Sequence, residues 1–141
     1  MNNISDYASN VRDLINGTVF TDANGKKFNV SDGTRICLDE LSNVRKRGGT
    51  VMVVGNGGSA AIASHLQNDL LKACYIRAIV FTEQPLLTAL TNDLGYERAY
   101  ELPIGVMAES GDFLIAISSS GQSKNILNAV KIAAIKKMKI I

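Results

Sequence analysis

Residues 51–59 read Val-Met-Val-Val-Gly-Asn-Gly-Gly-Ser, an apolar run that ends in a glycine-rich loop. Four consecutive apolar residues bounded by a glycine are typical of a strand that is buried on both faces of a parallel sheet. Apolar residues at helical spacing follow from Ser59 to about residue 73, and a second apolar run covers residues 76–81. The stretch therefore predicts a strand, a helix and a second parallel strand, which form the βαβ unit of an α/β layer fold.

The same alternation continues to the end of the sequence. Residues 84–109 have a mostly helical pattern, with breaks or helix starts expected at Pro85 and Pro103. Three further elements are predicted: a strand at residues 113–117, a helix at about residues 122–137 and the beginning of a strand at residues 138–141. Because natural domains seldom end as an apolar strand begins, we expect the domain to be incomplete at its C-terminus; the alternative is an edge strand that completes a small domain.

The sequence before residue 50 has a different organisation. Residues 3–16 predict an amphipathic helix whose apolar face needs a partner. Residues 17–33 centre on Asn24-Gly25 between short apolar pairs, which indicates a loop or a small hairpin, and a second helix is predicted from about Thr34 to Arg47. We therefore divide the chain into an N-terminal helix with its connecting loop, residues 1–33, and an α/β domain, residues 34–141.

Composition excludes several classes of protein. The 141 residues are 46% hydrophobic and carry a net charge of +2, so the chain should fold, without a strong field that attracts nucleic acid or an anionic membrane. No apolar run approaches the roughly 20 residues of a membrane span, and no signal peptide is evident. Cys37 and Cys74 lie outside any metal-binding or redox spacing, so we expect reduced thiols and a cytoplasmic location.

Two loops carry the candidate binding chemistry. In a parallel sheet the strands end where helices begin, and free backbone N–H groups with the helix dipole favour anions there. The loop after residues 51–54 has three glycines that let the backbone approach a ligand, and Ser59 can cap the helix that follows. The loop at residues 118–123 places four hydroxyls around one glycine, which is more than capping requires and favours a phosphate monoester. Neither loop has the spacing of a dinucleotide or NTP site.

Three motifs together carry a family resemblance. GNGGSAA at residues 55–61 with His65 after it, TNDLGY at residues 91–96 and SSSGQS at residues 118–123 resemble sugar isomerase (SIS) domains, and among them the bacterial phosphoheptose isomerases. The resemblance covers about residues 31–141. It implies a flavodoxin-like three-layer α/β sandwich with a parallel sheet, preceded by N-terminal helices. It also implies a homotetramer with active sites between subunits, which would give the N-terminal helix a partner.

The implied reaction interconverts sedoheptulose 7-phosphate and D-glycero-D-manno-heptose 7-phosphate, a precursor for lipopolysaccharide or capsule. This aldose–ketose isomerisation moves a proton between C1 and C2 through an enediol, so it needs a positioned acid or base. His65 and Asp69 are separated by four residues and share one helix face. By resemblance Asp69 stands where the family has its catalytic glutamate, and both residues match positions that bind zinc in some members. No other cofactor is implied.

The resemblance also assigns the remaining site residues. For the sugar it implies contacts from Asn56, Gly57, Gly58, Ser59, Asn92 and Asp93, with Asp93 reaching a hydroxyl or orienting the glycine loop. For the phosphate it implies Ser118, Ser119, Ser120 and Ser123. We expect Lys124, Lys131 and Lys136 to form a solvated helix face rather than a site.

Two departures from the family pattern bear on activity. Asp69 is one methylene shorter than glutamate, which can displace a carboxylate by about 1 Å and lower the rate on the order of a hundredfold. The family's second catalytic residue, a histidine, lies in a helix beyond Ile141. The alternative function is therefore a non-catalytic SIS domain that binds a phosphosugar or associates with a replication initiator protein. A SIS lyase, which would need its own catalytic glutamates, ranks last.

Overall fold

The computed structural model describes residues 3–141, which form two compact units divided between Glu40 and Leu41. The first unit begins with α1 (Ile4–Asn16), whose first turn is capped by the Asn3 side chain, and none of its residues is buried. A two-stranded antiparallel ribbon follows, made of β1 (Phe20–Thr21) and β2 (Lys27–Phe28). The hairpin predicted around Asn24-Gly25 is thus confirmed.

The second helix, α2 (Val30–Lys46), begins four residues earlier than the sequence pattern predicts. Asn29 explains the early start, because its side chain accepts a hydrogen bond from the backbone N–H of Asp32 in the manner of an N-cap. Gly33 lies in the first turn, where any β-carbon would collide with the ring of Phe20. The predicted boundary at residues 33–34 therefore lies inside α2, and the division between the two compact units lies further along the same helix.

The second unit contains a four-stranded, all-parallel sheet in the order β4-β3-β5-β6. Its strands are β3 (Thr50–Gly55), β4 (Arg77–Val80), β5 (Phe113–Ile117) and β6 (Lys139–Ile140). The helices between them are α3 (Gly58–Lys72), α4 (Gln84–Leu94), the 3-10 turn η1 (Tyr96–Arg98), α5 (Glu101–Met107) and α6 (Lys124–Ile135). Pro85 and Pro103 each lie in the first turn of a helix, so both predicted helix starts are confirmed.

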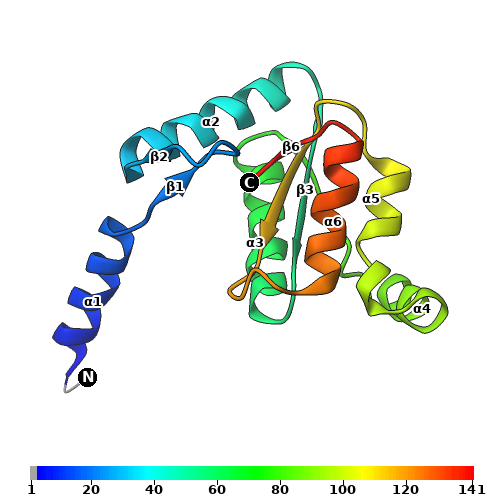
Figure 1. The fold of residues 1–141 in the computed structure, drawn as a ribbon, viewed down its shortest axis with the longest axis horizontal. Helices are drawn as coiled ribbons and strands as arrows, with labels where there is room; N and C mark the ends of the chain where they lie inside the picture. The colour runs from blue at the N-terminus through cyan, green and yellow to red at the C-terminus, as the bar shows by residue number, and fades with distance from the viewer. Residues whose placement is uncertain (1–2) are drawn as a thin grey trace. The chain divides into compact units, whose positions relative to one another are not determined.

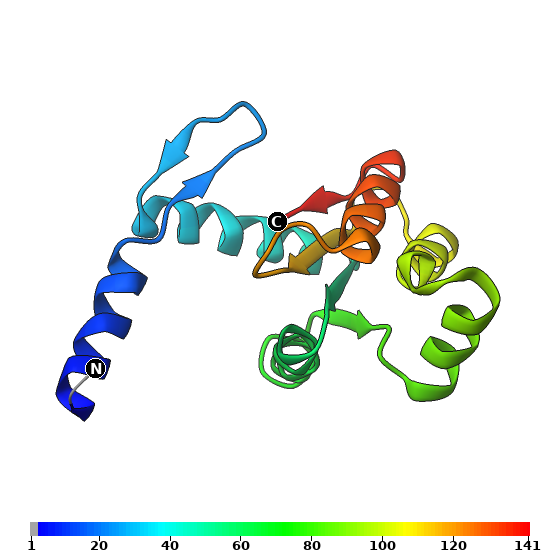
Figure 2. The same ribbon diagram turned by 60° about the horizontal axis from the view of Figure 1, so that its bottom comes forward.

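Successive side chains of β3 point to opposite faces of the sheet, and the core therefore has two layers. Met52 and Val54 pack with residues of α5 and α6 on one face of the sheet, whereas Val51 and Val53 pack with residues of α3 on the other. Figures 1 and 2 show α3 on one side of the sheet and α6 on the opposite side. The predicted three-layer α/β sandwich is therefore confirmed for the second unit, and the burial of its central strands β3 and β5 explains their continuous apolar runs in the sequence.

Two expectations drawn from composition can be compared with the structure. Within residues 3–141, no helix is both long enough and apolar enough to cross a membrane. Cys37 and Cys74 are both free thiols, and partial burial raises the pKa of the Cys37 thiol.

Candidate functional site

The two candidate loops begin side by side. In the parallel pairing of β3 with β5, Gly55 is opposite Ile117, so the glycine loop (residues 55–59) and the serine loop (residues 118–123) leave the sheet at the same edge. Each loop leads into the amino end of a helix, α3 or α6. This is the arrangement in which backbone N–H groups and helix dipoles favour an anionic ligand.

The glycine loop turns so tightly that Gly55 cannot carry a side chain without rearrangement. A β-carbon at Gly55 would lie 2.7 Å from the backbone C and O atoms of Ser59. The helix-capping role predicted for Ser59 is wrong, because Gly57 is the N-cap residue and α3 has no side-chain cap. Instead, the backbone N–H of Ser59 donates to the carbonyl of Asn56 at 2.9 Å, so a backbone turn closes the start of the helix.

The side chain of Asn56 is engaged by other parts of the protein. Its Nδ2 donates to Asn125 Oδ1 at 3.0 Å, and its Oδ1 accepts from Asn125 Nδ2 and from the Tyr96 hydroxyl, both at 2.8 Å. The resemblance assigned Asn56 to the sugar. That assignment stays a prediction, and in this structure the carboxamide of Asn56 joins the glycine loop to η1 and to the first turn of α6.

Tyr100 fixes the first residue of the same loop. Its hydroxyl is buried and donates to the carbonyl oxygen of Gly55 at 2.6 Å. Burial, and then the neighbouring Tyr96, raise the pKa of Tyr100 to about 12, so the hydroxyl keeps its proton at neutral pH. Tyr100 and Asn125 were not among the site residues predicted from the sequence. The available signal was a polar residue, Asn125, directly before the apolar stripe of α6.

The four serines of the second loop divide into two pairs. Ser118 Oγ accepts a hydrogen bond from the backbone N–H of Gly121, and Ser120 Oγ accepts one from the backbone N–H of Gln122, both at 3.1 Å. These two hydroxyls therefore shape the loop itself. The hydroxyls of Ser119 and Ser123 make no hydrogen bond within the described part of the chain, although Ser123 is the N-cap residue of α6. Both hydroxyls are wholly available to a ligand, whereas Ser118 and Ser120 already accept one hydrogen bond and keep their O–H protons to donate.

In the motif at residues 91–96, the last residue, Tyr96, makes the hydrogen bond to the glycine loop. Asn92 and Asp93 lie in the last turn of α4, where Asn92 Nδ2 donates to Asp93 Oδ1 at 2.8 Å and both residues are exposed. Tyr96, not Asp93, makes the side-chain hydrogen bond to the glycine loop.

His65 and Asp69 lie on one face of α3, as their spacing predicts. The distance from His65 Nε2 to Asp69 Oδ2 is 3.6 Å, and the two side chains are 77% and 55% exposed. They line an open, apolar depression together with Ala61, Ile62 and Leu66. A carboxylate beside an imidazole, open to a ligand, can take up and return a proton.

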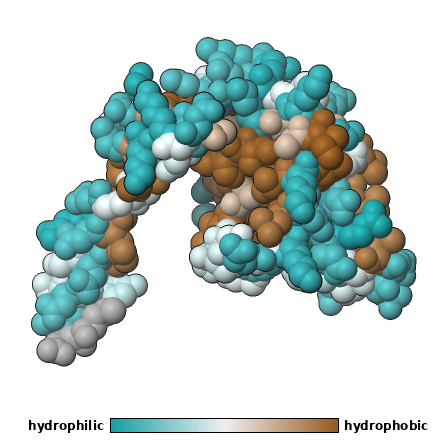
Figure 3. Space-filling view, in the orientation of Figure 1, coloured by the Kyte–Doolittle hydropathy of each residue, from teal (hydrophilic) through white to brown (hydrophobic). Residues whose placement is uncertain are grey.

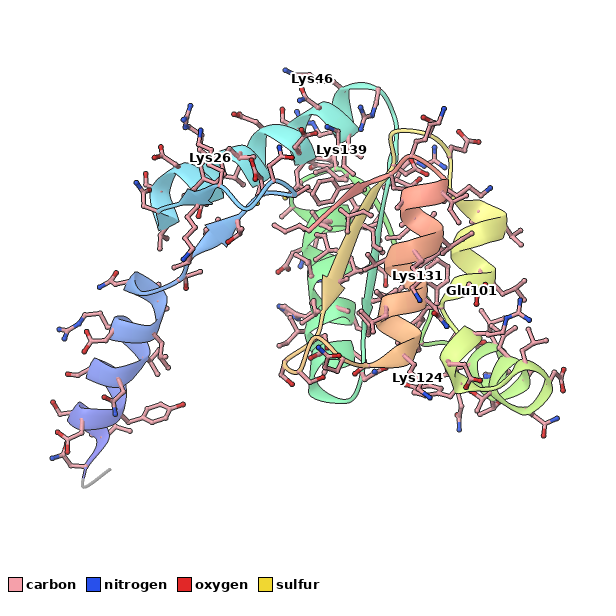
Figure 4. The ribbon with its side chains drawn as sticks, in the orientation of Figure 1. Lys26, Lys46, Glu101, Lys124, Lys131 and Lys139 are labelled. Atoms are coloured by element: carbon pink, nitrogen blue, oxygen red, sulfur yellow. The ribbon has the colours of Figure 1, made fainter. Side chains whose placement is uncertain are left out.

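A second depression lies between the two loops. It is lined by Asn56, Tyr96, Glu97, Ser123, Lys124 and Asn125. Figure 4 shows Lys124 at the amino end of α6 and Lys131 further along the same helix. Lys131 is exposed, as expected for a solvated face. Lys124 was expected on the same face and is exposed too, but it also borders the depression beside Ser123 and brings a positive charge to it.

The family resemblance can now be compared with known proteins. A sequence model of the SIS domain family matches residues 6–141. The chain is 38% identical to the phosphoheptose isomerase of Haemophilus ducreyi over 107 residues and to that of Aliarcobacter butzleri over 106 residues. These matches cover 72% and 71% of this chain and 55% and 54% of the relatives, so the chain spans about half the length of the curated relatives it matches.

Solved structures give the same result for the fold. Phosphoheptose isomerases from Neisseria gonorrhoeae and Francisella tularensis match with TM-scores of 0.77 and 0.80, at 25% and 28% sequence identity. Both matches cover 96% of this chain, and 70% and 68% of the other chains. The chain therefore belongs to the SIS domain family.

Proposed function

We propose that this protein is a phosphosugar isomerase that interconverts sedoheptulose 7-phosphate and D-glycero-D-manno-heptose 7-phosphate, a reaction that serves lipopolysaccharide or capsule synthesis. The observation that carries the proposal is the serine loop, which offers two unengaged hydroxyls at the amino end of α6, next to the glycine loop. The names of the relatives support the substrate class and the reaction.

Phosphate binding falls to the serine loop. Ser119 and Ser123 donate their hydroxyl protons to phosphate oxygens, and the free N–H groups at the start of α6 add to them. Lys124 contributes a positive charge from the border of the adjoining depression. Ser118 and Ser120 also set the loop conformation, because their oxygens accept backbone hydrogen bonds, and each keeps a hydroxyl proton that it can donate to the phosphate.

Proton transfer falls to the pair on α3. The Asp69 carboxylate removes a proton from the carbon next to the carbonyl while the carbonyl oxygen gains a proton, which gives the enediol. Asp69 then returns its proton to the former carbonyl carbon as the hydroxyl on the neighbouring carbon loses its proton and becomes the new carbonyl. His65 lies 3.6 Å from that carboxylate and is exposed, so its imidazole can donate a hydrogen bond to an enediolate oxygen. A sugar phosphate anchored at one end would present its other end to this pair.

The family resemblance implies that some members bind zinc through the positions of His65 and Asp69. In this chain these two residues form only part of a zinc site. His65 and Asp69 supply one nitrogen and one oxygen donor, and residues 3–141 contain no group of three or more histidine, cysteine, aspartate or glutamate side chains that could hold a metal ion. Zinc sites in proteins take three or four protein ligands. The two residues could serve as part of such a set, and no step of the proposed reaction is assigned to the metal.

Removing the two unengaged hydroxyls should weaken phosphate binding. We expect Ser119→Ala and Ser123→Ala each to raise the dissociation constant for inorganic phosphate by about tenfold or more, since a hydrogen bond to a charged group contributes roughly 1.5–3 kcal/mol. Isothermal titration calorimetry measures the change. Ser110→Ala is the matched control, because Ser110 is an exposed serine in the turn before β5. An unchanged affinity in both loop variants would contradict the assignment.

A homotetramer is part of the proposal. The apolar face of α1 is uncovered in the single chain: Ile4 is 83% exposed and Leu14 is 74% exposed. In the second unit, apolar surface gathers over α3, β5 and β6 (Figure 3), and the exposed residues there include Ile62 and Ile140. Contacts between subunits would remove such surface from water.

A charged residue introduced into the apolar face of α1 tests whether this helix holds the proposed tetramer together. We expect Leu14→Glu to reduce the mass measured by multi-angle light scattering below that of a tetramer, because a buried carboxylate without a partner is costly. Arg12→Glu makes a charge change on the polar face of the same helix and should leave the tetramer intact. A tetramer that persists in Leu14→Glu would show that α1 does not hold the subunits together.

The proposed location is the cytoplasm. Cys37 and Cys74 are free thiols, which persist in a reducing compartment. Recovery of the protein in the soluble cytosolic fraction of its own cells is the expected result, and recovery outside the cell would contradict it.

A further inference from the structure

We propose that Asn125 is a positioning residue, which pairs with Asn56 so that the glycine loop and the serine loop keep one fixed relative geometry. We name the side chains of Asn56, Asn125 and Tyr96 the amide clamp. The identity of the ligand that the two loops bind rests on the proposed function, whereas the mechanical role of the clamp does not.

The two asparagines form a reciprocal pair. Each donates from Nδ2 to the Oδ1 of the other, at 3.0 and 2.8 Å, across 69 positions of sequence. Asn125 is only 3% exposed, and its Oδ1 also accepts from the backbone N–H of Ile126 at 3.0 Å. Two antiparallel hydrogen bonds between planar amides fix both the distance and the orientation of the groups they join.

The pair joins the two halves of the site. Asn56 lies in the turn between β3 and α3, and Asn125 lies in the first turn of α6, two residues after Ser123. A shift of the glycine loop would therefore displace the amino end of α6, and with it the Ser123 hydroxyl that we assign to phosphate. The depression lined by Ser123 and Lys124 lies directly against the pair.

A third segment is tied to the same turn. The Tyr96 hydroxyl donates to Asn56 Oδ1 at 2.8 Å, and the Tyr100 hydroxyl donates to the Gly55 carbonyl at 2.6 Å. Gly55 and Asn56 thus make four hydrogen bonds with distant side chains, three of them accepted and one donated by Asn56. This number of hydrogen bonds is expected for a loop whose position is fixed by specific polar contacts as well as by burial.

Packing by itself does not explain an amide at residue 125. The next inward-facing residues of α6, Ile126 and Ala129, are buried and apolar, and an apolar side chain at position 125 would extend the same stripe. An apolar residue would not specify the orientation of Asn56, because the hydrophobic effect is non-directional.

The substitution Asn125→Asp distinguishes a role of residue 125 in orienting Asn56 from a role in core packing alone. At neutral pH the carboxylate can accept from Asn56 Nδ2 but cannot donate to Asn56 Oδ1, so one hydrogen bond of the pair is lost. When the carboxyl is protonated, it both donates and accepts, and the two-bond pair is restored in the same shape. Burial raises the pKa of such a carboxyl, whereas the backbone N–H of Ile126 and the amino end of α6 lower it. The protonation state of residue 125 is therefore measured by NMR titration of the variant.

Two measurements follow this change between pH 7.5 and pH 5. At pH 7.5 we expect amide hydrogen exchange in residues 55–59 to be about tenfold less protected in Asn125→Asp than in the wild type, and inorganic phosphate to bind about tenfold more weakly. At pH 5 both ratios should return to near one. The titratable groups are Tyr96 within the clamp and Glu97, Lys124 and Tyr100 beside it. All four are present in both proteins, so the ratio at each pH cancels their contribution.

Two further variants make the outcome decisive. Asn43→Asp introduces the same charge at an exposed residue of α2 and should match the wild type at both pH values. Tyr96→Phe removes only the hydroxyl at the border of the clamp, so it should lower the protection of residues 55–59 at both pH values without recovery at pH 5. It also tests the clamp if Asn125→Asp does not fold.

The possible results are distinct. Equal protection and equal binding in Asn125→Asp and the wild type at pH 7.5 would overturn the positioning role. So would a loss that does not recover at pH 5 in a folded variant whose carboxyl NMR titration shows to be protonated at that pH. If the wild type binds no phosphate while protection of residues 55–59 still follows the protonation of residue 125, the clamp stands and the proposed ligand is wrong.

Discussion

Replacing Asp69 by Asn should lower the kcat of isomerisation by about 10²–10⁴-fold, which is the usual contribution of a positioned acid or base. The amide has nearly the shape of the carboxylate but cannot take up the proton that moves between C1 and C2. Phosphate affinity should change little, because Asp69 lies on α3 and the phosphate hydroxyls lie in the serine loop. A loss in kcat with an unchanged KM is the expected signature.

Proton NMR of sedoheptulose 7-phosphate in D₂O measures the reaction directly. Isomerisation through an enediol brings solvent deuterium onto the sugar and produces aldose signals, and both should disappear in Asp69→Asn. Asp39→Asn, at an exposed carboxylate of α2, is the matched control. Asp69→Glu, which has the longer side chain implied by the family resemblance, should retain activity.

Two outcomes would contradict this assignment in different ways. Deuterium uptake at the wild-type rate in Asp69→Asn would remove Asp69 from the proton transfer. If the wild type broadens the phosphorus resonance of the sugar phosphate but incorporates no deuterium, the chain binds a phosphosugar without isomerising it, and the non-catalytic function is correct.

Replacing Gly55 by Ala should destabilise the second unit and disorder the glycine loop. The added β-carbon would lie 2.7 Å from backbone atoms of Ser59, and backbone cannot move aside as a flexible side chain can. We expect the free energy of unfolding to fall by about 1–3 kcal/mol, the usual cost of overpacking. Displacing Gly55 would also stretch its hydrogen bond from Tyr100.

Urea unfolding followed by circular dichroism measures this loss. Gly58→Ala is a matched control for stability, because a β-carbon at Gly58 meets no heavy atom within 4 Å outside its immediate surroundings and the residue begins α3. Alanine favours a helix more than glycine does, so this variant should be as stable as the wild type or slightly more stable. Equal urea midpoints for the two variants would show that the loop tolerates a side chain at residue 55.

The sequence by itself determined the fold class of the second unit and the general place of the site. Four apolar runs separated by helical patterns predict a parallel α/β sheet, since burial on both faces leaves no alternation in the strands. The sequence also placed each loop where a strand ends and a helix begins, whereas the pairing of β3 with β5, which puts the two loops side by side, was decided by the tertiary structure. The spacing of His65 and Asp69 placed them on one helix face, because local backbone geometry alone decides it.

Only the tertiary structure decided which polar side chains are free to bind a ligand. The four serines look equivalent in sequence, yet two of them accept hydrogen bonds from their own loop. Ser59 looks like a helix cap, but a backbone turn ends at that residue instead. Asn56 looks like a ligand contact, and its carboxamide is engaged by Asn125 and Tyr96.

The physical reason is the range over which each interaction acts. Helix and strand periodicity arises between residues a few positions apart, so it can be deduced from the order of the amino acids. The partner of a hydrogen-bonding side chain is whatever group the folded chain brings within about 3 Å. For Asn56 that partner lies 69 positions away in the sequence, and only the packing of α6 beside the glycine loop brings the two amides together.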